Sequence, residues 1–197
     1  MEARRADRAD SAGMAATLAG AFFHDPVWGW AFSDAARRTA QHEAWFRLEL
    51  DSALAHRWVW TTPGHEAVAL WIPPGQPELT DADIAELRTL LHETTGERAE
   101  LILEVMDCFD AAHPDGPDHF YLSLLGTHPD HRGAGVGMRL LADTLAHVDA
   151  AGAPAYLEST NPANLARYAS VGFEILTTFD LPHGGPTVTT MWREPRP

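Results

Sequence analysis

The sequence predicts an α/β fold in which helices flank a central mixed, mostly antiparallel sheet. A strand-like run at 120–127 passes through a glycine-rich loop into an amphipathic helix. Two pairs of β-rich runs, within 57–72 and 173–192, are each joined by a turn containing proline and glycine, as is typical of antiparallel neighbours. A chain of 197 residues can bury one good core and is short for two, so we expect a single domain over residues 1–197.

Charge and hydropathy narrow the class of partner. Twenty-eight acidic and fourteen basic side chains give a net charge of −14, which disfavours nucleic acid and suits a cationic small molecule. A generic solubility feature is the more common cause of such a charge. No apolar segment approaches the ~20 residues that a membrane span needs, and no signal peptide is evident at the N-terminus. We therefore expect a cytoplasmic protein with no membrane partner.

The N-terminal segment begins with a short strand near residues 2–6, followed by a helix. Asp10 can cap this helix, which carries Met14, Leu18 and Phe22 on one face and stops before Pro26. A second helix is expected at 35–55. Its inward residues are Trp45, Phe46, Leu50 and Leu54, and its solvent-facing residues are Arg37, Arg38, Glu43 and Glu49.

Between these two helices, residues 24–32 are unusually aromatic and are interrupted by proline and glycine. This composition predicts a loop or a short irregular helix. Trp28 and Trp30 either line a pocket for an acceptor molecule or fill the core between helices, and both interpretations suit large aromatic side chains.

The middle of the chain is predicted to be a hairpin followed by two helices. Strands at 57–61 and 66–72 flank Pro63 and Gly64, and the proline-rich residues 73–77 end the second strand. A capping pattern at Thr80 begins a helix that Gly96 interrupts, and a further helix runs on to residues 113–117.

The C-terminal third returns to a strand, a helix and two strands. Gly152 ends the helix that follows the glycine-rich loop, and residues 155–159 form the next strand. Asn161 can cap a short helix that presents Asn164 and Tyr168 on one face. Strands at 173–179 and 187–192 then close the chain as an antiparallel pair.

Three glycines precede the central helix, and they allow backbone N–H groups to approach a phosphate at its positive end. The pattern lacks the lysine and hydroxyl of a mononucleotide loop, and Met138 stands where a dinucleotide loop has glycine. Arg132, Gly135 and Gly137 instead resemble the Arg/Gln-x-x-Gly-x-Gly/Ala loop of the GCN5-related N-acetyltransferases. A turn without any ligand is the alternative.

A second segment, 161–173, with Asn-x-x-x-Tyr followed by Gly-Phe, is also similar to this family. The amino-acid sequence of residues 120–192 most resembles the actinomycete puromycin N-acetyltransferase branch of the family. The resemblance implies an acetyl-CoA-binding half at 118–194 and an acceptor-side half at 1–117. It also implies that the loop cradles the pyrophosphate of acetyl-CoA and that backbone before the loop faces its pantetheine. The expected cofactor-binding residues are Leu125, Gly126, Thr127, Arg132, Gly133, Ala134, Gly135, Val136, Gly137, Met138 and Asn164.

Three residues outside this loop carry specific expectations. Gly126, inside a strand, predicts a β-bulge that frees backbone N–H groups. Tyr168 is the candidate general acid for the leaving thiolate, with simple ring packing as the alternative. Glu158 is the candidate base, because a carboxylate within an apolar strand is exposed, paired or functional. An ordinary edge-strand glutamate explains it almost as well. A neutral histidine in a loop, namely His24, His113 or His119, or a water molecule is the alternative base.

Together these features predict an acetyl-CoA-dependent N-acetyltransferase acting on a primary amine of a small molecule, an antibiotic or aminonucleoside-like amine in an antibiotic-resistance role. Trp28, Trp30 and Glu158 are the expected acceptor-binding residues. A non-catalytic acyl-CoA sensor and a protein or peptide N-acetyltransferase are the alternatives. No metal is expected, because His128 and His131 lack a third ligand at a convincing spacing. Association as a homodimer is left open.

Overall fold

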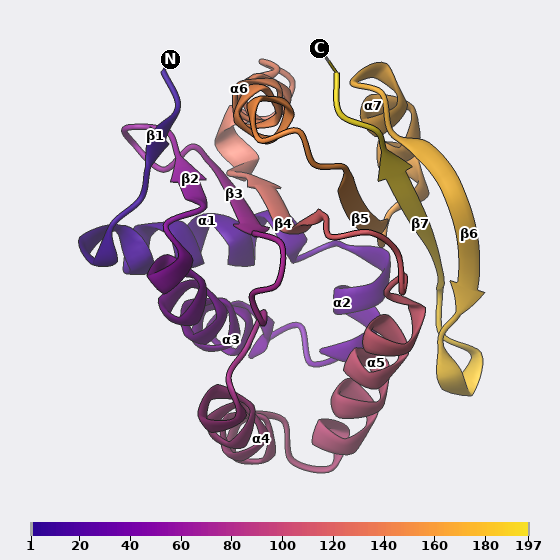
Figure 1. The fold of residues 1–197 in the computed structure, drawn as a ribbon. Helices are drawn as coiled ribbons and strands as arrows, with labels where there is room; N and C mark the ends of the chain where they lie inside the picture. Colours follow the sequence, from indigo (N-terminus) through magenta and orange to yellow (C-terminus); the bar gives the residue numbers. More distant parts are fainter. Residues whose placement is uncertain (1, 197) are drawn as a thin grey trace.

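The computed structural model describes residues 2–196, and within them one mixed sheet has the strand order β1-β2-β3-β4-β5-β7-β6 (Figure 1). Only β4 and β5 are parallel neighbours, which confirms the predicted mostly antiparallel sheet. The strands are β1 Arg4–Arg5, β2 Val59–Thr61, β3 Ala67–Ile72, β4 Phe120–Thr127, β5 Ala155–Ser159, β6 Glu174–Asp180 and β7 Thr187–Arg193.

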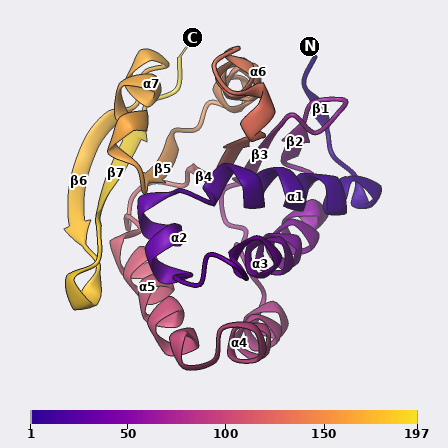
Figure 2. The ribbon, with the colours of Figure 1, turned by 180° about the vertical axis from the view of Figure 1, so that it is seen from behind.

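Helices cover both faces of the sheet (Figures 1 and 2). On one face α1 and α3 pack against β3, and α1 also packs against β4, whereas α6 packs on the other face. None of the helices in the described chain is long and apolar enough to cross a membrane. The helices are α1 Ser11–Phe22, α2 Pro26–Ala31, α3 Arg38–Ala53, α4 Asp81–Thr95, α5 Ala99–Ala112, α6 Val136–Ala150 and α7 Leu165–Ser170.

The core consists of two apolar layers separated by β3. Val68 and Leu70 belong to the layer under α1 and α3, whereas Ala69 and Trp71 belong to the layer under α6. Side chains of a strand point alternately to opposite faces, so a strand covered on both sides is apolar along its whole length. This explains why every residue of β3 is buried.

The aromatic segment after α1 is a short helix. Asp25 caps α2 by accepting hydrogen bonds from the backbone N–H groups of Val27 and Trp28, and Pro26 occupies the first helical position. Proline is favoured there because its fixed φ suits a helix and its missing N–H has no helical partner. Pro26 therefore begins α2, and it also follows the end of α1 at Phe22.

Two side chains of α3 do not face solvent as expected. Arg38 is half-buried and donates to the backbone carbonyls of Phe23 and Phe32, so it ties α3 to the segment around α2. Glu49 is only 6% exposed. The prediction of a solvated Glu49 was wrong because this residue lies four positions after Trp45, on the same buried side of the helix.

Candidate active site

The two parallel strands at the centre of the sheet separate along their length. β4 and β5 pair only at Phe120 with Ala155 and at Tyr121 with Tyr156. Beyond these pairs, backbone groups on the facing edges of the two strands have no strand partner. Buried backbone N–H and C=O groups require partners, so the gap can accept an extended ligand that carries amide groups.

A β-bulge lies in the separated part of β4, but it is not at Gly126. Leu70 of β3 lies opposite Leu124, whereas the next residue, Trp71, lies opposite Leu122, so Ser123 is the extra residue of β4. Gly126 pairs regularly with Val68. The prediction of a bulge at Gly126 was wrong.

Gly126 is required for a different reason, namely the close approach of a helix. A Cβ there would come within 2.8 Å of the Leu18 side chain and 3.0 Å of the Ala21 side chain, both on α1. Real Cβ atoms are almost never this close to a neighbour, so the glycine allows α1 to rest directly on β4.

The glycine-rich loop is open where an anion would approach. Gly133 and Gly135 have φ values of +80° and +72°, a region that favours glycine. A Cβ at Gly133 would have no neighbour within 4 Å, and one at Gly135 would meet only the guanidinium of Arg139, at 3.4 Å. In the described chain no side chain caps the N-terminus of α6, so its first N–H groups and the positive end of its dipole face this space.

Two further contacts hold the loop in place. Arg132 donates to the backbone carbonyl of Ala21 at 2.7 Å, which ties the loop to the C-terminal end of α1. The missing side chain of Gly137 allows α6 to pack against the hydroxyl of Thr127, with which a Cβ would collide. The predicted cofactor-binding residues of β4 and of the loop thus lie together where β4 meets α6, whereas Asn164 lies at the N-terminus of α7.

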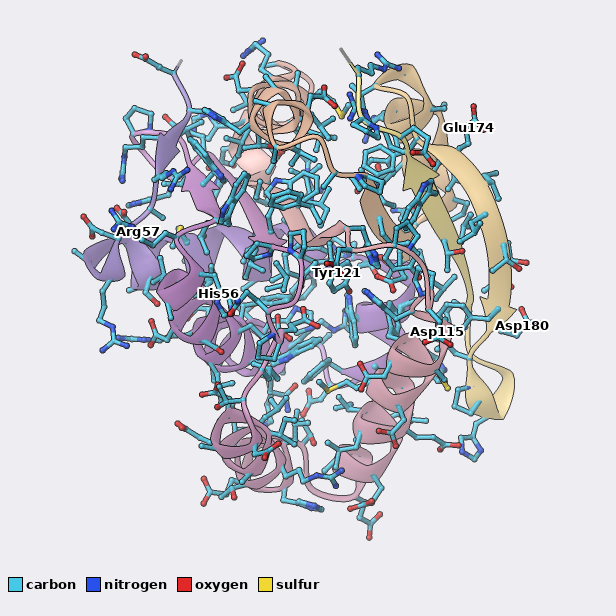
Figure 3. The ribbon with its side chains drawn as sticks, in the orientation of Figure 1. His56, Arg57, Asp115, Tyr121, Glu174 and Asp180 are labelled. Atoms are coloured by element: carbon cyan, nitrogen blue, oxygen red, sulfur yellow. The ribbon has the colours of Figure 1, made fainter. Side chains whose placement is uncertain are left out.

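A cavity continues from the β4–β5 gap toward the helices of the other face. Its walls include Leu125 of β4, Glu158 of β5, and Asn164 and Tyr168 from the segment around α7. A second cavity adjoins it and shares Glu158 and Tyr121. Figure 3 shows Tyr121 in the interior of the molecule, whereas Glu174 and Asp180 lie at the outer edge on β6.

Glu158 is a buried carboxyl without a cationic partner. Its side chain is 2% exposed, and among the described residues its Oε1 has no hydrogen-bond partner. Burial, assisted by the negative charge of Glu78, raises the pKa of Glu158 to about 8, although the phenols of Tyr121 and Tyr156 oppose the shift. A carboxyl that titrates close to neutral pH can both accept and release a proton.

Two histidines connect Glu158 with the second cavity. Nδ1 of His113 lies 4.0 Å from Oε1 of Glu158, and Nε2 of His113 lies 3.0 Å from Nε2 of His119. Burial and the neighbouring His119 lower the pKa of His113, so its ring favours the neutral form. Both histidines line the second cavity, which gives a chain of proton-carrying groups leading away from Glu158.

Tyr168 has the protonation state that an acid needs. It is half-buried on α7, its ring packs edge-on against Phe173 at 6.2 Å, and it lines the first cavity. Burial and the nearby Asp25 raise the pKa of Tyr168 to about 12. The phenol is therefore protonated at neutral pH and can donate.

The two tryptophans of α2 have different surroundings. Trp28 lines the first cavity and stacks on Phe109 at 5.6 Å, so it serves both the core and the pocket. Trp30 does not line either cavity within the described chain. Its ring lies 5.8 Å from the guanidinium of Arg98 and is packed against Gly185.

Three acidic residues that the sequence did not single out also line the first cavity, namely Glu49, Glu78 and Asp110. Ser123, the bulged residue, donates a hydrogen bond to Glu78. Burial raises the pKa of Glu78 to about 7 and raises that of Glu49 as well. Glu49 shares a helical face with Trp45, which was a usable signal, whereas Glu78 follows a proline-rich linker that has no periodicity.

No group of three or more histidine, cysteine, aspartate or glutamate side chains within residues 2–196 is arranged to hold a metal ion.

Comparison with solved structures places this fold among acetyltransferases. A structure from Corynebacterium glutamicum, described as histone acetyltransferase HPA2 and related acetyltransferase, is 25% identical with a TM-score of 0.70, covering 99% of this chain and 96% of that one. A polyamine N-acetyltransferase of Drosophila melanogaster that forms N-acetylagmatine is 15% identical with a TM-score of 0.64, covering 98% and 99%. Arylalkylamine N-acetyltransferase 2 of Aedes aegypti is 14% identical with a TM-score of 0.61, covering 99% of each chain.

The sequence itself carries the family assignment. Residues 57–173, more than half of the chain, match the model of the Acetyltransferase (GNAT) family. This range contains the hairpin, the β4–β5 gap, the glycine-rich loop, Glu158 and Tyr168. The chain therefore belongs to the GNAT family of acetyltransferases, which use acetyl-CoA as the acyl donor.

Proposed function

We propose that this protein transfers the acetyl group of acetyl-CoA to the primary amine of a small molecule by direct attack. The observation that carries the proposal is Glu158, a buried carboxyl with an unpartnered oxygen in the same cavity as Tyr168, at the gap between β4 and β5. An unpaired buried carboxyl is costly, so its retention beside a pocket favours a catalytic use.

The residues of the loop and gap suit acetyl-CoA as a substrate. The pyrophosphate would lie against the backbone from Arg132 to Met138, where the positions of Gly133 and Gly135 leave space. The amide-bearing pantetheine would run along the free edge of β4 at Leu125, Gly126 and Thr127, with Asn164 on the opposite side. The thioester would then reach the cavity that holds Glu158 and Tyr168.

Glu158 and Tyr168 account for the two proton transfers that the reaction needs. The amine nitrogen forms a bond to the thioester carbon, and the carbon–sulfur bond breaks. Glu158 takes a proton from the amine and His113 passes it toward His119 and solvent, while Tyr168 donates a proton to the leaving thiolate. The products are the N-acetylated amine and CoA, and solvent restores the proton of Tyr168.

The residues that line the first cavity suggest the chemical class of the acceptor. Trp28 supplies an aromatic wall, and the carboxyls attract a cationic amine. A small amine with an apolar or aromatic body fits, and an aminonucleoside or another antibiotic amine is one candidate. The acetylation of agmatine and arylalkylamines by the fly and mosquito enzymes supports the choice of small amines over peptides.

A thioester-consumption assay tests the proposal. Purified protein is mixed with acetyl-CoA and with aminonucleosides, aminoglycosides, polyamines, amino acids or histone-like peptides, and thiol release is measured. Release that depends on an added small amine supports the proposal. CoA binding without turnover of any amine supports a sensor instead, and a preference for peptides supports a protein N-acetyltransferase.

A further inference from the structure

A second carboxyl in the first cavity has an unpartnered oxygen. Glu49 of α3 is 6% exposed and lines this cavity, and within residues 2–196 its Oε2 has no hydrogen-bond partner. It lies on the wall opposite the strands, because α3 packs beneath the sheet whereas Glu158 belongs to β5. The proton transfer described above makes no use of it.

Within residues 2–196, no arginine neutralises the acidic side chains of the two cavities. The fourteen basic residues are all arginines, and none of them lines either cavity. A buried carboxylate without a cation or a full set of hydrogen bonds loses its hydration without compensation. A bound molecule that carries positive charge would complement Glu49 in its ionised form.

A third acidic residue, Glu78, lines the same cavity as the two carboxyls that have an unpartnered oxygen. The charge of Glu78 raises the pKa of both Glu49 and Glu158, so Glu78 is close enough to act on each. The aromatic rings of Trp28, Trp45 and Phe109 line the same cavity, with Trp28 and Trp45 in edge contact at 4.5 Å. A guest that fits both features has positive charge at two places and an apolar portion between them.

We propose that the acceptor is a linear dication, with a primary amine at one end and a second amine or a guanidinium at the other. The amine beside Glu158 receives the acetyl group, and the other cationic end binds Glu49, with Glu78 adding to the attraction. The apolar chain between the ends lies against Trp28 and Trp45. This inference rests on the proposed function and narrows it, because it favours a diamine over an amine with a single charge, such as an aminonucleoside.

The test compares acetylation of α,ω-diamines of three to six carbons with that of n-alkylamines of the same length. A further comparison with 4-aminobutyl guanidine shows whether the second cationic group is preferred as an amine or as a guanidinium. Charge-assisted hydrogen bonds predict that kcat/KM for the best diamine exceeds that of its matched monoamine about tenfold or more. Glu49→Gln, which keeps the shape and removes the charge, should reduce this ratio toward one. Glu43→Gln, an exposed change on the same helix, should leave the ratio as in the wild type.

Glu49→Asp gives a sharper readout that remains available if Glu49→Gln folds poorly. It withdraws the carboxylate by one methylene, so the preferred diamine should become longer by one carbon. Equal rates for diamines and monoamines in the wild type would overturn the inference while leaving the acetyltransferase assignment intact. A diamine preference that survives in Glu49→Gln, or an unchanged length preference in Glu49→Asp, would also overturn it.

A binding measurement separates this inference from the proposed function. Calorimetry with 1,5-diaminopentane and with pentylamine, in the presence of CoA, needs no turnover. One outcome is that no amine releases thiol, that the diamine binds more tightly than pentylamine, and that Glu49→Gln removes this difference. In that case the proposed acetyl transfer is wrong and the cation site at Glu49 is supported. If the two compounds bind equally, the cation site fails.

Discussion

Nδ1 of His113 lies 4.0 Å from Oε1 of Glu158, across the boundary between the two cavities. This is longer than a hydrogen bond but short enough for a small rotation or one bridging water to complete the link. His113 in turn contacts His119 at 3.0 Å. The pair therefore places a group that can relay a proton beside the buried carboxyl of Glu158.

The first prediction concerns the rate and its dependence on pH. The base acts when it is deprotonated, so kcat/KM should rise with pH through the pKa of Glu158, about 8. Glu158→Gln should lower kcat about 10²-fold and remove this rise. Steady-state rates across the pH range provide the measurement. A variant with the full rate and an unchanged profile would transfer the role of base to His113.

The second prediction concerns stability. The raised pKa means that the folded chain holds the proton of Glu158 more tightly than the unfolded chain does. The resulting stabilisation is fully present below the ordinary pKa of 4.5 and is lost as the pH rises through about 8. The Tm of the wild type should therefore fall relative to Glu158→Gln over this window. Glu174→Gln, an exposed change on β6, should show no such trend, and a constant difference for Glu158→Gln would contradict the burial argument.

The third prediction isolates the acid. Tyr168→Phe keeps the ring that packs against Phe173 and deletes the proton, so kcat should fall on the order of 10²-fold. The affinity for acetyl-CoA, measured by calorimetry, should be nearly unchanged. A normal kcat would show that the tyrosine serves packing alone.

The fourth prediction tests the anion loop. Gly135→Val places a side chain at the α6 N-terminus, where a Cβ meets only the Arg139 guanidinium, at a φ of +72°. The affinity for CoA should therefore fall at least about tenfold. Gly152→Val is a matched control, because Gly152 follows α6 at its other end with a φ of +71° and no Cβ neighbour within 4 Å. Both variants should lose similar stability, and only the first should lose CoA. Unchanged CoA affinity in a folded Gly135→Val protein would remove this loop from the site.

The fifth prediction separates the two tryptophans of α2. Trp28→Ala removes a wall of the cavity, so KM for the amine should rise by up to about tenfold while acetyl-CoA affinity stays intact. Trp30 is packed against Arg98 and Gly185 outside the cavity, so Trp30→Ala should change KM little. A large effect of Trp30 on KM alone would support the sequence-based assignment of both residues to the acceptor.

The sequence by itself was sufficient for the features that depend on near neighbours along the chain. The alternating and helical periodicities predicted the strands and helices, and turn residues such as Gly96 and Gly152 marked where helices end. The loop of Arg132, Gly135 and Gly137 was recognisable because a strand, glycines and a helix follow one another directly. These local rules require no knowledge of how distant segments meet.

Only the tertiary structure decided which residues surround the pocket. The bulge is at Ser123, because strand register depends on the pairing of β3 with β4, whereas Gly126 meets a helix more than one hundred residues earlier in the chain. Glu78 follows an irregular linker, and its neighbours Ser123 and Asp110 come from distant segments. Burial and charge coupling depend on such long-range contacts, so the acidic lining that Glu49, Glu78 and Glu158 give to the first cavity exists only in the folded chain.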